Sequence, residues 1–149
     1  MSVSPEALRL SLQWVEKAEN DLLTAEHTLG LGEACPTDMI CFHAQQCVEK
    51  YLKAVLGIQG IAHPRTHDVA HLIALLPEPS AVGLEPEEQE RLTDYATVTR
   101  YPGDYEPISV EEARAAVEVA RRARDCLRGL LPPEASSGPG FIVCGSRPD

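Results

Sequence analysis

The segment from Cys41 to Leu56 places two different faces on one predicted helix, and it constrains the fold more than any other part of the chain. Apolar side chains recur every three or four residues, which gathers them into one stripe on a helix. The stripe contains Ile40, Ala44, Cys47, Val48, Tyr51, Leu52 and Val55. Polar donors form a second strip on roughly the opposite side, consisting of His43, Gln46, Lys50 and Lys53. The first face predicts a core, and the second is either exposed to solvent or functional.

The remaining segments predict an all-α protein. Three- and four-residue rhythms indicate long helices over about residues 5–29, 37–58, 86–100 and 109–131, and a short helix over about residues 69–76. The low aromatic content, 5%, together with many Ala and Leu residues, favours helices over sheets. We therefore predict an antiparallel, up-and-down helical bundle of four long helices plus a short one over residues 1–131. Residues 132–149 predict a flexible tail rich in Pro, Gly and Ser.

The net charge and the cysteine content indicate which partners and which cellular compartment to expect. The formal net charge of −10 gives no overall attraction to nucleic acid, so RNA or DNA would need a local basic patch. Arg114, Arg121, Arg124 and Arg128 on the last long helix either complement its dipole or form part of a surface for an anionic ligand. Five cysteines without a CxxC pair predict reduced thiols and a cytoplasmic protein. The sequence predicts neither a membrane span nor a signal peptide.

Three histidines, His63, His67 and His71, are spaced by four residues, a pattern that would suit a metal on one helical face. Pro64 opposes this interpretation because the residue before a proline is pushed out of the helical region. No metal site is therefore predicted, and Thr66 or Asp68 is expected to cap a short helix instead. Trp14 lies beside the apolar stripe of the first helix and is predicted to be a packing aromatic.

Three motifs stand out along the chain: the run from Phe42 to Lys53, the Thr66-His67-Asp68 step, and Arg100-Tyr101-Pro102 before the last helix. Together they resemble the HEPN domain family (higher eukaryotes and prokaryotes nucleotide-binding domain). The resemblance implies an antiparallel helical bundle, commonly a homodimer. It also implies binding of a nucleotide such as ATP, GTP or AMP, or pairing with a small nucleotidyltransferase in the manner of a toxin–antitoxin pair.

A ribonuclease is the alternative that the resemblance raises. The family's ribonucleases carry an arginine followed a few residues later by a histidine, but Tyr105 occupies the nearest histidine position after Arg100. An unperturbed tyrosine, with a pKa of about 10, is a poor base at neutral pH. The missing histidine therefore weakens the hypothesis of a metal-independent ribonuclease toxin. A purely structural partner subunit is a third possibility. Modification of Tyr101 or Tyr105 by a partner enzyme stays open, and enzymatic activity is not the favoured interpretation.

Together with this resemblance, the donor strip and the Arg100-Tyr101 pair lead us to expect a nucleotide-binding site consisting of His43, Gln46, Lys50, Lys53, Arg100 and Tyr101. The two lysines would meet phosphate as point charges, and Arg100 would bind it through two donors. Gln46 would bond a base or ribose, and Tyr101 would stack on a base. Two alternatives for the donor strip stay open. It is either a solvated face with pairs such as Glu49–Lys53, or a dimer interface where His43 and Gln46 form hydrogen bonds.

Overall fold

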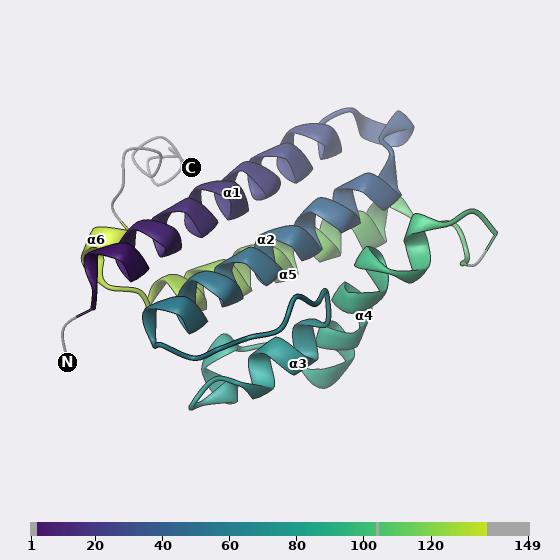
Figure 1. Cartoon of the computed structure of the whole chain (residues 1–149). Helices are drawn as coiled ribbons and strands as arrows, with labels where there is room; N and C mark the ends of the chain where they lie inside the picture. The colour runs from purple at the N-terminus through teal and green to yellow at the C-terminus, as the bar shows by residue number, and fades with distance from the viewer. Residues whose placement is uncertain (1–2, 104, 137–149) are drawn as a thin grey trace.

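Six α-helices follow one another along residues 3–103 and 105–136, the part of the chain that the computed structural model describes (Figure 1). They are α1 (Pro5–Leu29), α2 (Thr37–Ile58), α3 (Val69–Ala74), α4 (Pro86–Ala96), α5 (Val110–Arg128) and α6 (Pro133–Ser136). The connections contain three short 3₁₀ helices, η1 (Gly32–Ala34), η2 (Pro79–Val82) and η3 (Val98–Arg100). The predicted all-α bundle with four long helices is confirmed. The helix predicted over about residues 86–100 ends at Ala96, and the 3₁₀ helix η3 follows it.

Side-chain caps explain where three of the helices begin. Ser4 accepts a hydrogen bond from the backbone N–H three residues ahead at the start of α1, Asp68 does the same for α3, and Ser109 for α5. Each cap satisfies one of the N–H groups that have no partner inside the helix. The cap predicted at Asp68 is therefore confirmed, and Ser4 and Ser109 cap α1 and α5 in the same way.

The start of α2 differs from the starts of α1, α3 and α5. Pro36 occupies the N-cap position, and no side chain caps this helix. The hydroxyl of Thr37, the first residue of α2, donates instead to the carbonyl of Ile108 at 2.7 Å. The beginning of α2 is thereby tied to the segment that leads into α5.

Helix α2 lies at the centre of the bundle. It forms an antiparallel hairpin with α1, packs against α5 on a second side, and contacts α3 and α4 on a third (Figure 1). The predicted apolar stripe of α2 is fully buried at all seven positions. The facing stripe of α1 is also buried, at Val15, Ala18, Leu22 and Ala25. Both stripes follow the helical repeat, so each forms a continuous apolar surface along its helix. The buried surface of α2 packs against the surrounding helices and forms the centre of the core.

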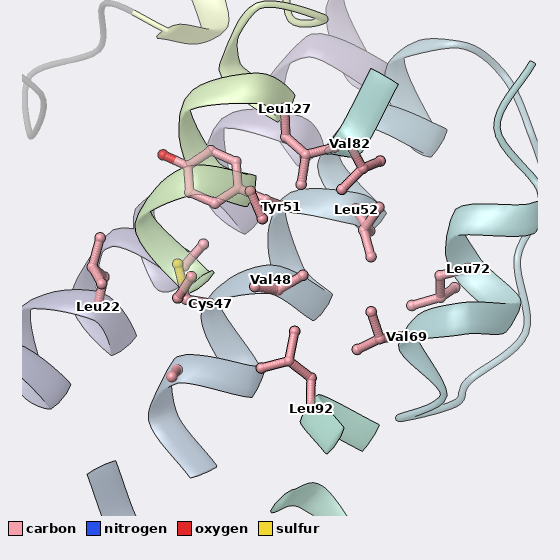
Figure 2. Packing of buried hydrophobic residues seen from close by; sticks show 14 of the residues in the cluster. Leu22, Cys47, Val48, Tyr51, Leu52, Val69, Leu72, Val82, Leu92 and Leu127 are labelled. Carbon is pink, nitrogen blue, oxygen red and sulfur yellow. The ribbon is translucent and has the colours of Figure 1, made fainter. Parts of the chain in front are cut away.

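Large side chains of α2 fill the core where the other helices meet it. Figure 2 shows Tyr51 between Leu22 of α1 and Leu127 of α5, with Val48 and Leu52 on the side of α2 that faces Val69 and Leu72 of α3. Helix α5 turns small residues toward this core, namely Ala113, Ala116, Ala120 and Ala123, all buried. Small side chains allow two helix backbones to approach closely.

The packed part of the chain extends beyond residue 131. Residues Pro133–Ser136 form α6, whose Ala135 is fully buried, and α6 contacts α1. Proline at the first helical position favours this start. The structure therefore shortens the predicted tail, and its residues 137–149 lie outside the described part of the chain. Over the described residues, no helix has the length and apolar character needed to cross a membrane.

Candidate functional site

The predicted donor strip of α2 faces α1 rather than open solvent. Asp21 of α1, itself buried, accepts hydrogen bonds from His43 Nδ1 at 2.8 Å and from Lys50 Nζ at 2.5 Å. Gln46 is 9% exposed and donates to Gln45 Oε1 at 2.7 Å. These donors are bonded inside the chain, so the interpretation of a fully solvated face is wrong.

A buried carboxylate, Glu49, organises the next part of α2. Its Oε1 accepts from Gln45 Nε2 at 3.0 Å and from His67 Nδ1 at 2.8 Å, and its Oε2 accepts from Lys53 Nζ at 2.9 Å. Burial raises the pKa of this carboxyl, but hydrogen bonds from Lys53, Gln45 and His67 outweigh burial and hold the pKa below its ordinary value of 4.5. Glu49 is therefore ionised at neutral pH, and the predicted Glu49–Lys53 pair is present.

The same network fixes His67 at the surface. Gln45 Nε2 also donates to the backbone carbonyl of His67 at 3.1 Å, which holds the loop before α3 against α2. An ionised Glu49 carboxylate can only accept a hydrogen bond, so Nδ1 of His67 carries the hydrogen that it donates to Glu49. The second ring nitrogen, Nε2, is left for other partners. The His67 side chain is 57% exposed, so Nε2 is accessible from outside the bundle.

A cavity of about 550 Å³ lies between α1, α2 and this loop. We call it the Arg65 cavity. The described residues that line it are Trp14, Lys53, His63, Pro64, Arg65, Thr66 and His67, and none of them is a carboxylate. Lys53 Nζ lies 5.4 Å from the centre of the Trp14 ring, a cation–π distance.

Two groups in the Arg65 cavity lack partners among the described residues. Arg65 is exposed and forms no hydrogen bond or ion pair with residues 3–103 or 105–136. His63 Nδ1 is buried and has no hydrogen-bond partner in that part of the chain. Buried polar atoms in folded proteins are usually bonded, so His63 Nδ1 is an atom that a ligand or water would satisfy.

A second cavity, of about 390 Å³, adjoins the first. We call it the Tyr101 cavity; its described lining is His67, Ala96, Thr97 and Tyr101. His67 lines both cavities. Tyr101 is 66% exposed.

The structure divides the predicted site. It brings Lys53 and Tyr101 to adjoining cavities, but it engages His43, Gln46 and Lys50 in hydrogen bonds inside the chain. The side chain of Arg100 lies outside what the structure describes. Tyr105 is half-buried in the loop before α5 and is not among the described residues that line either cavity.

Sequence reasoning missed Trp14, His63, Arg65 and His67 as site residues. One signal could have found the loop: residues 50–67 contain no Asp or Glu, although the chain has 23 of them. In an acidic protein, an acid-free segment with histidine and arginine is where an anion meets the least repulsion.

Two of the four arginines considered on α5, Arg121 and Arg124, are bound to acids of the same chain and are not free to bind an anion. Arg121 Nε donates to Glu26 at 2.7 Å, and Arg124 binds Glu19 through Nε at 2.5 Å and Nη2 at 3.0 Å. Both acids belong to α1, so these arginines tie α5 to α1.

A smaller cavity of about 210 Å³ between α4 and α5 carries acidic groups, Glu87, Glu88 and Glu112.

The family model for the HEPN domain matches residues 11–130. The chain belongs to the HEPN domain family. HEPN domains commonly dimerise.

Two solved structures are similar to this HEPN domain. The protein TT1696 from Thermus thermophilus has 28% sequence identity and a TM-score of 0.68, with 81% of this chain and 98% of that chain covered. ST0689, an archaeal HEPN homologue, has 28% identity and a TM-score of 0.62, with 80% of this chain and 95% of that chain covered. A comparison with curated proteins found no significant match.

Proposed function

We propose that this HEPN domain binds a nucleotide, with a phosphate in the Arg65 cavity. The supporting observation is the composition of the described lining, which combines arginine, lysine, two histidines and an indole without a carboxylate. The whole chain carries a formal charge of −10, so its surface repels anions on average. A carboxylate-free cavity in such a protein is a place where an anionic ligand can bind.

Arg65 is the group best suited to hold the phosphate. Lys53 is largely neutralised by Glu49, at 2.9 Å, whereas Arg65 has no counterion among the described residues. A guanidinium offers two parallel N–H donors that match two phosphate oxygens. Arg65 therefore supplies an unneutralised positive charge and the geometry for bidentate binding.

Trp14 and His63 would hold the rest of the nucleotide. Bases of every kind stack on an indole, and His63 Nδ1 would gain the partner it lacks. The volume of about 550 Å³ is within the usual range for small-molecule sites. The site therefore has room for a base as well as a phosphate.

Replacing Arg65 with alanine should weaken nucleotide binding roughly 10- to 100-fold, because a charge-assisted hydrogen bond to phosphate is lost. Trp14 is the single tryptophan of the chain, so its fluorescence reports on this cavity. Titration with ATP, GTP and AMP, followed by fluorescence and by calorimetry, measures the affinities. Arg114→Ala, at an exposed arginine on α5, is the matched control and should bind like the wild type.

Absence of heat and of any thermal shift at millimolar nucleotide would count against nucleotide binding. Equal weakening in the Arg65→Ala and Arg114→Ala variants would show that overall charge, not this cavity, controls the affinity. A homodimer, pairing with a nucleotidyltransferase and ribonuclease activity stay predictions of the resemblance. Light scattering, co-purification with a nucleotidyltransferase and RNA cleavage assays test them.

A further inference from the structure

The two cavities meet at one side chain, His67. Its Nδ1 is bonded to Glu49 at 2.8 Å, so its Nε2 is the atom that can contact a ligand in either cavity. A protonated imidazole donates from Nε2 to a phosphate oxygen, and a neutral one accepts from a sugar hydroxyl. A ligand that spans both cavities would therefore pass directly over His67.

The charge around this point matches a phosphate with a single negative charge. The Lys53 ammonium and the Glu49 carboxylate cancel each other, which leaves Arg65 as the permanently charged group of the described lining that is not neutralised. A phosphodiester carries one negative charge, whereas a triphosphate carries several. The site is thus better balanced by a phosphodiester than by a nucleoside triphosphate.

Each cavity offers one aromatic ring. Trp14 lines the Arg65 cavity and Tyr101 lines the Tyr101 cavity. Tyr101 leaves 66% of its surface in water, and a stacked base would cover that ring. The hydroxyl of Thr97 donates to the Thr93 carbonyl at 3.1 Å, which leaves its oxygen to accept from a sugar or base.

We infer that the two cavities together take two nucleosides joined by a phosphodiester, with the linking phosphate beside Arg65 and His67 and one base on each of Trp14 and Tyr101. This inference rests on the proposed nucleotide binding and specifies its ligand. Both bases must be unpaired to stack on protein rings, so the ligand is a free dinucleotide or two residues of a single strand.

Titrations with adenylyl-adenosine, AMP and ATP test this ligand class on the full chain, with Trp14 fluorescence as the readout. The second stacked base should make adenylyl-adenosine bind about 5- to 100-fold more tightly than AMP. Tyr101→Ala should abolish this difference, because it removes the ring on which the second base stacks. Tyr101→Phe keeps the ring and should preserve it, and Arg65→Ala should weaken both ligands. Because Tyr101 is exposed, neither substitution there threatens folding.

Equal affinities for AMP and adenylyl-adenosine, or a preference that survives Tyr101→Ala, would overturn the two-base site. If AMP binds through Arg65 without a dinucleotide preference, nucleotide binding stands and the inference fails; if nothing binds, both fail. A longer single-stranded oligoadenylate distinguishes the two sources. Binding as tight as that of the dinucleotide identifies a single strand, exclusion identifies a free dinucleotide, and both results support the two-base site.

Discussion

Replacing Arg124 with methionine should lower the free energy of unfolding by about 3–5 kcal/mol, because it leaves a charge buried without its counterion. Arg124 binds both oxygens of Glu19, at 2.5 and 3.0 Å, and Glu19 is only 7% exposed. The hydroxyl of Tyr51 also donates to Glu19, but a phenol cannot replace a guanidinium charge. Urea denaturation followed by circular dichroism measures the loss.

Two further variants separate charge from packing. Glu19→Gln combined with Arg124→Met removes both charges and should recover much of the lost stability. Arg122→Met breaks an exposed pair with Glu88 and should change the stability by less than about 1 kcal/mol. If Arg124→Met costs no more than Arg122→Met, the buried pair does not stabilise the fold.

The pH dependence of stability should change sign in this variant. Burial raises the pKa of Glu19 in the wild type, but Arg124 and Tyr51 outweigh burial and hold the pKa below its ordinary value of 4.5. A carboxyl with a depressed pKa stabilises the fold above that value, and the stabilisation is lost as pH falls through the folded-state pKa. Without Arg124, burial dominates and should place the pKa of Glu19 above 4.5, so protonation of Glu19 should stabilise the variant as pH falls from that raised pKa toward 4.5.

The second large effect is expected for Glu49→Gln, which should destabilise the protein by about 3 kcal/mol. The amide leaves Lys53, only 8% exposed, without its counterion, and it cannot accept on both sides as the carboxylate does. The pKa of Glu49 is also held below 4.5. The ionised carboxylate therefore stabilises the wild-type fold above pH 4.5, and this stabilisation is lost as pH falls through the folded-state pKa. The variant should lose less stability than the wild type between pH 7 and pH 4.

Denaturation at both pH values checks this prediction. Glu49→Gln with Lys53→Met is the matched control, because it removes the stranded charge and should be more stable than the single variant. A single variant as stable as the wild type at pH 7, with the same loss at pH 4, would contradict a structural role for the Glu49 charge.

The helices were predictable because their signals are local. Apolar residues of α2 recur every three or four positions, which is about one helical turn. The caps at Ser4 and Ser109 bond to residues three positions away. Intrinsic helical signals of this kind do not depend on which helices pack together. The family motifs likewise lie within continuous segments of the chain.

The partners of the donor strip were not predictable for the same reason. His43 and Lys50 bond to Asp21, which is 22 and 29 positions away, and only the packing of α1 on α2 brings them together. The site loop depends on Gln45 holding the His67 carbonyl across a similar separation. Spacing on one helix shows which side chains share a face, but not which face meets another helix.

The α1–α2 hairpin also bears on the order of folding. Its two long helices are adjacent in sequence, joined by residues 30–36, so little loop-closure entropy opposes their pairing. The pair between Glu19 and Arg124, 105 positions apart, closes a much longer loop. We expect the hairpin to be largely formed in the transition state, so that Ala18→Gly slows folding while Arg124→Met mainly accelerates unfolding. Stopped-flow folding rates across a urea series test this order, and equal slowing of folding by both variants would contradict it.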